Sequence, residues 1–381
     1  MRELAADAIE DLATGAAILG TGGGGDPHIG KLMAQSAIAE HGPVELLDPT
    51  EVPADALVIP TAGMGAPTVL IEKPPAGTEP IAALRRVAAE FEQEVFATMP
   101  IECGGINSTI PFAVAAREGL PVVDADGMGR AFPELHHETF NVYGVSGSPA
   151  CVADEHGNTT LIEATDNRSL EDLARAITIE MGGQAYVSDY PMTGEQVRDT
   201  AIANTVDLGI RIGAAVRDPP ADATPIEAIK RVTADSSYGR AIELFHGKIV
   251  DVERRTEAGF AVGTVMIEGF DADAGDRLTI DFQNENLIAR RNGTVVATVP
   301  DLITVLEQET GEAITTEGLR YGYRVRVLGI PSPAIMRSEG ALSIWGPRSF
   351  EYDVAFTPLE RQFPAYYREH GVPETKTQLL E

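Results

Sequence analysis

Cysteine, positive charge and long apolar runs are all scarce in this sequence. Cys103 and Cys151 are its only cysteines, which excludes a framework of several disulfides and a zinc site made of cysteines alone. No apolar run approaches the roughly 18 residues that a membrane-spanning helix needs. The first residues lack the basic and apolar regions of a secretory signal. These absences predict a cytoplasmic protein that folds around hydrophobic cores.

The balance of charge is strongly acidic. Lys and Arg total 29 against 58 for Asp and Glu, so the formal net charge is -29 at pH 7. Nucleic-acid binding depends on Lys and Arg side chains that neutralise phosphates, and this balance therefore excludes a nucleic-acid partner. The acidic residues are spread along the whole chain. Because salt screens their mutual repulsion, the composition favours a salt-rich cytoplasm and a halophilic archaeon as the source.

The pattern of apolar residues changes along the chain, and at 381 residues two domains are expected. In the first part, apolar runs that predict strands alternate with helical patterns, which favours an α/β domain with a mainly parallel sheet. The predicted strands are residues 44–47, 56–59, 101–104 and 121–124, and the predicted helices include residues 3–18, 27–40 and 78–99. We assign residues 1–167 to this N-terminal α/β domain, which carries the proposed site.

The remaining residues, 168–381, are assigned to a C-terminal β-rich domain. Helical patterns over residues 169–181 and 194–216 come first, and beyond residue 240 short β-rich runs alternate with turns. Asn292-Gly293 is typical of a tight hairpin turn. This α+β pattern predicts a barrel-like or sandwich-like domain.

Two turns in the N-terminal domain are crowded with polar side chains. The first offers Glu102, Asn107 and Ser108, and the second offers Asp124, Asp126, Arg130 and Glu134. Parallel strands bring their carboxyl ends to one edge of a sheet, where open α/β sheets bind ligands. Paired carboxylates divide into a base and an acid where their surroundings separate their pKa values. We therefore predict the second turn as catalytic and the first as substrate-binding. The alternative is that one aspartate caps the next turn and the other is solvated.

A glycine-rich loop precedes the predicted helix at residues 27–40. Its spacing, Gly20-x-Gly22-x-x-Gly25, matches a dinucleotide fingerprint, but the residues before it have a helical pattern where that fingerprint needs a strand. Asp26 would also place a negative charge beside a pyrophosphate. We favour a loop whose N–H groups hold a small anionic or carbonyl group, which makes Gly22, Gly23, Gly24 and Asp26 substrate-binding candidates. The alternative is a tight turn where two backbones approach closely.

Two further features suggest metal or thiol chemistry. His136 and His137 are adjacent, and neighbouring side chains on a helix point about 100° apart, so they rarely bind one metal together. Either could pair with Asp124 or Asp126, or simply lie at the surface. Cys103 has no neighbouring histidine to activate it and is read as a buried thiol. No metal ligand and no cofactor are predicted, and a divalent metal stays open as an alternative.

Several strings of the sequence together resemble a known family. They are ILGTGGGGDPHIG, GMGAP, GGINSTIPFAVAAREGLPVVDADGMGRAFPEL, LFHGKIVDVERRTEAGFAVG, FQNENLIA, VPDLI and LRYGYRVRVLGIP. In order and content they are similar to the S-methyl thiohydantoin desulfurase family, formerly a domain of unknown function, with an N-terminal and a C-terminal domain. The resemblance implies hydrolysis of an S-methylated thiohydantoin ring to the hydantoin and methanethiol. It also implies an association with hydantoinase and oxoprolinase subunits.

Three functional hypotheses follow. The first is a hydrolase of a cyclic amide-like ring, in which Asp124 or Asp126 activates water and Arg130 and Asn107 donate hydrogen bonds, with Glu134 holding Arg130. The second is an accessory subunit of a hydantoinase or oxoprolinase complex. The third is an NAD-dependent oxidoreductase. The expected partners are a small heterocyclic substrate, hydantoinase-type subunits and further copies of the same chain.

Overall fold

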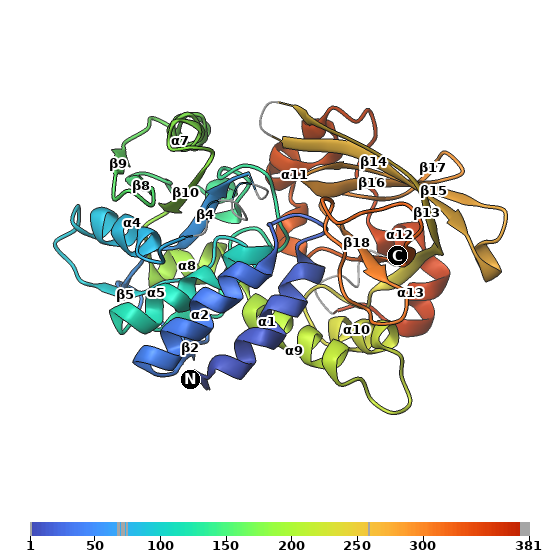
Figure 1. The fold of residues 1–381 in the computed structure, drawn as a ribbon, viewed down its shortest axis with the longest axis horizontal. Helices are drawn as coiled ribbons and strands as arrows, with labels where there is room; N and C mark the ends of the chain where they lie inside the picture. The colour runs from blue at the N-terminus through green and yellow to red at the C-terminus, as the bar shows by residue number, and fades with distance from the viewer. Residues whose placement is uncertain (1, 67–68, 70–72, 74, 258–259, 374–381) are drawn as a thin grey trace.

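The fold consists of two parts that lie side by side. The structure is a computed structural model that describes residues 2–66, 69, 73, 75–257 and 260–373. In Figure 1 the helices and short strands of the N-terminal part lie on the left, and the long strands of the C-terminal sheet lie on the right. None of the helices among the described residues is long and apolar enough to cross a membrane.

Parallel pairing occurs at the centre of the N-terminal part. The strands involved are Arg2–Leu4 (β1), Val44–Leu47 (β2), Leu57–Val58 (β3), Val95–Ala97 (β5), Val122–Val123 (β6) and Met192–Thr193 (β11). Strand β2 pairs with β6 and β3 pairs with β5, both in parallel, and a parallel bridge from Thr98 to Val122 joins the two pairs. Strands β1 and β11 pair at the edges in the antiparallel sense. The arrangement is therefore mixed, with parallel pairing at its centre.

A second sheet of the N-terminal part is wholly antiparallel. Its strands, in spatial order, are Thr61–Gly65 (β4), Gln184–Ser188 (β10), Ala150–Ala153 (β8) and Thr159–Ile162 (β9). Strand β10 follows residue 168 in the chain, yet it pairs with β4 and β8 on either side. A boundary at residue 168 therefore divides the strands of one sheet between two domains.

Helices cover these sheets (Figure 1). The longer ones are Ala6–Leu19 (α1), Pro27–His41 (α2), Glu79–Ala88 (α4), Ile110–Glu118 (α5), Asn167–Glu180 (α7) and Thr205–Arg217 (α9), while Pro225–Ala234 (α10) lies below the C-terminal sheet in Figure 1. Helix α2 begins as the sequence predicted, with Asp26 accepting a hydrogen bond from the backbone of His28 at 2.8 Å and Pro27 in the first turn. Helices α1 and α9 touch backbone to backbone, because a Cβ at Gly15 would lie 1.8 Å from the carbonyl oxygen of Gly209.

Three predicted elements differ from the structure. The helix expected over residues 78–99 ends at Ala88, because residues 95–97 pair with β3 as a strand. The run at residues 101–104 forms no strand and turns instead. The helix expected over residues 194–216 is two helices, Gly194–Thr200 (α8) and α9, separated by a strand at Ile202–Ala203 (β12). At residues 95–97 and 202–203, pairing with distant strands outweighs the local helical pattern.

The C-terminal part is a strongly curled antiparallel sheet, as its β-rich sequence pattern indicated. Its strands are Ile242–Glu257 (β13), Phe260–Gly269 (β14), Arg277–Gln283 (β15), Glu285–Arg291 (β16), Thr294–Thr298 (β17), Leu302–Glu307 (β18) and Arg324–Ile330 (β19), in the spatial order β17-β16-β15-β14-β13-β19-β18. Asn292 and Gly293 form the turn between β16 and β17, both with positive φ, as this dipeptide predicts.

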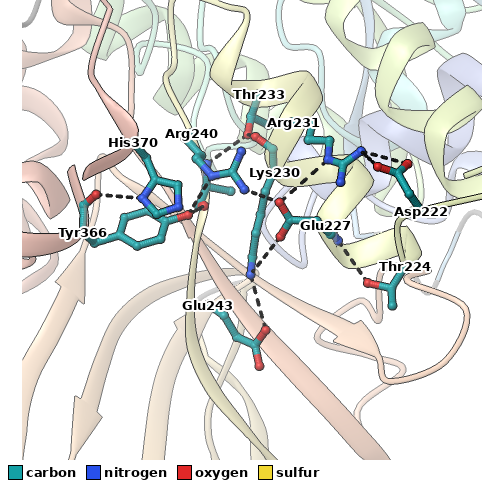
Figure 2. A network of polar contacts seen from close by, with 11 residues as sticks. Asp222, Thr224, Glu227, Lys230, Arg231, Thr233, Arg240, Glu243, Tyr366 and His370 are labelled. Carbon is teal, nitrogen blue, oxygen red and sulfur yellow. Dashed lines mark hydrogen bonds and ion pairs between the residues drawn. The ribbon is translucent and has the colours of Figure 1, made fainter. Parts of the chain in front are cut away.

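A network of charged side chains ties helix α10 to the C-terminal sheet and to helix Pro364–His370 (α13) (Figure 2). Arg240 pairs with Glu227 of α10 and hydrogen-bonds to the hydroxyl of Tyr366 at 3.0 Å. Lys230 of α10 lies 3.6 Å from Glu243 of β13. Ion pairs therefore hold helix α10 against the sheet, in addition to the apolar residues that the helix buries.

Candidate functional site

A cavity lies where the glycine loop, the N-terminal turns and the C-terminal sheet meet. Its volume is about 80 Å³. It is lined by Gly24, Gly25, Gly63, Met64, Gly65, Ile101, Glu102, Ile106, Asn107, Met128, Phe132, Pro133, Glu134, Leu135, Arg175, Gln184, Asn284 and Glu285. Three carboxyl groups line it, those of Glu102, Glu134 and Glu285, and because Glu102 and Glu285 come from the two parts of the chain, the site requires both parts.

Glu102 is held by the turn that follows it. Its Oε1 accepts a hydrogen bond from the side-chain amide of Asn107 at 2.7 Å, and Asn107 in turn accepts one from the backbone N–H of Gly63 at 2.7 Å. The backbone N–H of Phe132 donates to the other carboxyl oxygen at 3.3 Å. Asn107 lies in the 3₁₀ helix Gly105–Ser108, which begins with Gly105 at a φ of 51°. This conformation suits glycine and turns Asn107 back toward Glu102.

Glu285 begins strand β16 and is almost wholly buried. Burial raises the pKa of Glu285 to about 8, although the positive charge of Arg130 acts in the opposite direction. Burial, followed by the negative charge of Glu285, raises the pKa of Glu102 well above its usual range. Oε2 of Glu285 has no hydrogen-bond partner among the described residues. Burial therefore favours the protonated form of both Glu102 and Glu285, and the charge of Glu285 adds to the shift of Glu102.

The glycine loop is wedged between the two parts. A Cβ on Gly23 would lie 2.1 Å from a carboxyl oxygen of Glu285, and one on Gly24 would lie 2.8 Å from the carbonyl carbon of Gly104. The loop also accepts hydrogen bonds through its carbonyl groups, for example that of Gly22 from the backbone of Thr316 at 2.8 Å. These close contacts, with the side chain of Glu285 and the backbone of Gly104, explain why glycine occupies positions 23 and 24. The loop follows helix α1, so the strand that a dinucleotide fingerprint requires before it is missing here.

Arg130 connects the two parts of the chain from a fully buried position. Its guanidinium group donates to the hydroxyl of Thr21 at 2.7 Å, and to the carbonyl oxygens of Asn286 at 2.9 Å and Asp301 at 3.1 Å. Burial lowers the pKa of Arg130 to about 10. Arg130 is not among the residues that line the cavity. Its positive charge acts on Glu285, which does line the cavity, and lowers the pKa of that carboxyl group.

The two aspartates of the DADGMGR turn bind backbone groups. Asp124 accepts a hydrogen bond from the backbone of Asp207 at 3.0 Å, in the first turn of α9, and burial raises its pKa to about 6. Asp126 accepts hydrogen bonds from the backbone of Cys103 at 2.5 Å and Gly129 at 3.0 Å, and burial raises its pKa to about 7. Neither aspartate is among the residues that line the cavity.

The remaining predicted site residues also divide into those that line the cavity and those that do not. Glu134 lines the cavity, but it forms an ion pair with Arg168 and lies beside His136 and His137, whose pKa values burial lowers. Asp26 caps α2 and lines a different hollow beside α1. The hydroxyl of Ser108 donates to the carbonyl oxygen of Gly105 at 2.8 Å. Of the predicted site residues, the structure brings Gly24, Glu102, Asn107 and Glu134 together around the cavity, while Gly22, Gly23, Asp26, Ser108, Asp124, Asp126 and Arg130 are not among its lining residues.

Sequence reasoning missed four polar residues of the cavity: Arg175, Gln184, Asn284 and Glu285. All four lie beyond residue 168, outside the domain to which the site was assigned. The available signal was the string FQNENLIA, which contains Asn284 and Glu285 and stood among the strings that carry the family resemblance. Arg175 and Gln184 carried no signal, because a single polar residue in an amphipathic helix or a strand is ordinary.

Comparison with known proteins agrees with this architecture. An X-ray crystal structure of a protein from Chromobacterium violaceum has the same fold, with a TM-score of 0.78 at 23% sequence identity over 94% of this chain and 100% of the other. No curated protein matches the chain. Models of the S-Me-THD-like N-terminal and C-terminal domains match residues 7–164 and 165–359. The chain therefore belongs to the S-Me-THD-like family.

Proposed function

We propose that the chain hydrolyses an S-methylated thiohydantoin, or a related cyclic amide-like ring, and releases methanethiol and the hydantoin. One observation carries the proposal: Glu102 and Glu285 line one cavity, and burial raises the pKa of both. Two carboxyl groups that lose their protons at different pH can act as a base and an acid at the same time. Membership in the S-Me-THD-like family supplies the class of substrate.

The first step adds water to the ring carbon that carries sulfur. Glu285, whose pKa is raised only to about 8, acts as the carboxylate base and takes a proton from water. A bond forms between the water oxygen and the ring carbon. Glu102, whose pKa burial also raises, starts protonated and gives its proton to the ring nitrogen. The product of this step is a neutral tetrahedral adduct.

The second step breaks the carbon–sulfur bond. The hydroxyl group of the adduct returns a proton to Glu102 as the carbonyl of the hydantoin forms. The departing methanethiolate takes the proton that Glu285 carries and leaves as methanethiol. Both carboxyl groups end as they began. Asn107 keeps Glu102 oriented through its 2.7 Å hydrogen bond.

An alternative assignment within the same function uses Asp124 or Asp126 as the base, with Arg130 and Asn107 as donors. Both aspartates have raised pKa values, which suits a base near neutral pH. They bind backbone N–H groups and are not part of the cavity lining. For this reason we prefer the pair of glutamates.

The test is release of thiol from S-methyl thiohydantoins by the purified protein. Glu285→Gln and Glu102→Gln should each lower turnover by about 10²–10⁴, the usual range for a general base or acid. Asp189→Asn is the matched control, because Asp189 is also a buried carboxyl group with a raised pKa but does not line the cavity. Near wild-type turnover in both glutamine variants would remove the proposal. Thiol release that appears only after a hydantoinase-type subunit is added would favour an accessory role.

A further inference from the structure

The turn from Glu134 to His137 gathers three side chains of the kind that bind metal ions. Among the residues that the structure describes, one ligand atom from each of Glu134, His136 and His137 lies within 4.8 Å of the other two. Nε2 of His136 lies 3.5 Å from Oε2 of Glu134, and Nε2 of His137 lies 3.4 Å from the same oxygen. Both separations exceed the usual N–H···O distance of about 2.7–3.2 Å. Neither imidazole is therefore hydrogen-bonded to this carboxylate.

The separations match the edges of a metal coordination tetrahedron. A zinc ion binds imidazole nitrogen and carboxylate oxygen at about 2.0–2.2 Å, and the edge of a tetrahedron is about 1.6 times the distance from its centre to a corner. Neighbouring ligand atoms are then about 3.3–3.6 Å apart. Octahedral coordination at the same bond lengths would bring them to about 2.8–3.1 Å. The two observed distances fit the tetrahedral case.

The local backbone explains how adjacent histidines reach one point. Residues 134–137 form a turn, closed by a hydrogen bond of 3.0 Å from the backbone N–H of His137 to the carbonyl oxygen of Glu134. The helix Thr139–Val142 (α6) begins only after them, so the wide angle between neighbouring side chains of a helix does not apply. In this turn the imidazole rings of His136 and His137 lie 4.4 Å apart between centroids.

Helix α7 fixes the turn in place. Glu171 accepts a hydrogen bond from the backbone N–H of Leu135 at 2.9 Å, and Arg175 donates to the carbonyl oxygen of Pro133 at 2.8 Å. On the other side, Asn141 donates to the carbonyl oxygen of His136 at 2.8 Å. The backbone of the turn that carries the three ligand candidates is thus held from both sides.

A second observation concerns the imidazole of His137. Its residue is 4% exposed, it packs edge-on against Phe132 and Phe350, and Nδ1 of its ring is buried without a hydrogen-bond partner among the described residues, while Nε2 faces Glu134 at 3.4 Å. Buried polar groups nearly always have a hydrogen-bond partner, so a buried imidazole with an unpaired nitrogen needs an explanation. Nε2 is the ring nitrogen that a metal ion beside Glu134 would contact.

We propose that Glu134, His136 and His137 bind one divalent metal ion of the zinc class, with a fourth position left for water or another ligand. Two imidazoles and one carboxylate are a donor set that suits zinc and disfavours Mg²⁺. Because Glu134 lines the cavity, the ion lies at the cavity wall. Arg168 competes with it, since Nη1 lies 3.0 Å from Oε2 of Glu134, but this side chain is 58% exposed and free to turn toward Asp172.

The test is zinc binding, and it requires no substrate and no assumption about the reaction. Protein treated with a chelator is dialysed against zinc chloride, and bound metal is measured by elemental analysis, with Co²⁺ as a spectroscopic probe of tetrahedral geometry and Mg²⁺ as the control ion. The wild type should bind one zinc per chain. His136→Ala, His137→Ala and Glu134→Gln should each weaken binding by at least about 10–100-fold, because even the loss of an outer partner of a metal ligand costs that much.

Two controls make the result decisive. His156→Asn removes an imidazole that is 74% exposed and lies 3.3 Å from Glu155, so it should leave zinc binding unchanged. Arg168→Gln removes the competing cation and should tighten binding. Because His137 is buried, a melting curve is measured for every variant to show that it folds. If His137→Ala does not fold, the variants at the less buried His136 and Glu134 still test metal binding. A wild type that binds no zinc saturably, or ligand variants that bind it as the wild type does, would overturn the proposal.

Discussion

Glu102 and Glu285 come from opposite parts of the fold and line one cavity, and the charge of Glu285 raises the pKa of Glu102. This relationship ties the proposed chemistry to the junction between the two parts. The glycine loop packs directly against Glu285, because a Cβ at Gly23 would lie 2.1 Å from its carboxyl oxygen and would displace this side chain. A site of this kind forms only when both parts are folded and packed together.

The first prediction concerns the pH dependence of turnover. The base must be ionised, and burial raises the pKa of Glu285 to about 8, so the rate of thiol release should rise as pH increases toward and past about 8. The rate should fall where Glu102, whose pKa burial raises well above its usual range, loses its proton. In Glu285→Gln the rising limb should disappear. A rate that is flat from pH 6 to pH 9 in the wild type would contradict this assignment.

The second prediction concerns Arg130. Its guanidinium group binds Thr21 on one side and the carbonyl groups of Asn286 and Asp301 on the other. Hydrogen bonds to charged groups contribute about 1.5–3 kcal/mol each, so Arg130→Met should lower the free energy of unfolding by at least about 3 kcal/mol. Denaturant melts measure this change. Arg361→Met, at an exposed position, is the control and should alter stability by no more than about 0.5 kcal/mol.

The third prediction concerns the pH dependence of stability. Burial, followed by the negative charge of Glu171, raises the pKa of Asp189 from 3.8 to about 8. Between these two values the folded state binds more protons than the unfolded state. The contribution of Asp189 to stability is therefore full below about pH 4 and is lost as pH rises through about 8, with a slope of up to about 1.4 kcal/mol per pH unit. Asp189→Asn should lack this slope, which makes the variant more stable than the wild type at pH 8. Melts of both proteins at pH 5 and pH 8 provide the measurement.

The fourth prediction concerns salt. With a formal net charge of -29, the folded surface repels itself at low ionic strength. At molar salt the screening length falls to about 3 Å, so the repulsion is largely removed. The midpoint of thermal unfolding should therefore rise between low and molar KCl. A midpoint that falls or stays constant would show that the acidic composition does not govern stability.

The sequence correctly predicted local structure that depends on a few neighbouring residues. Asp26 followed by Pro27 predicted the start of α2, and Asn292-Gly293 predicted the turn between β16 and β17. Capping and tight turns depend on a few neighbouring residues, so the sequence alone contains the information. The polar turn that begins at Glu102 was likewise recognised, and two of its residues, Glu102 and Asn107, line the cavity.

Longer-range features could not be read in this way. Residues 95–97 have a helical neighbourhood, yet they form a strand because β3 lies beside them. His136 and His137 were expected to diverge as on a helix, and they converge because a turn closes between Glu134 and His137. Glu285 was not predicted as a site residue, because nothing near it in the sequence shows that the glycine loop packs against it.

The sequence by itself determined the acidic surface, the two-part organisation, the caps and turns, and the family to which the chain belongs. Each of these depends on composition, on neighbouring residues or on many short strings read together. Only the tertiary structure decided which carboxyl groups share a cavity, that Arg130 joins the two parts, and that Glu134, His136 and His137 converge. The shared cavity and the position of Arg130 depend on packing between residues that are far apart in the chain. The convergence of Glu134, His136 and His137 depends on a turn forming where the sequence pattern suggested a helix.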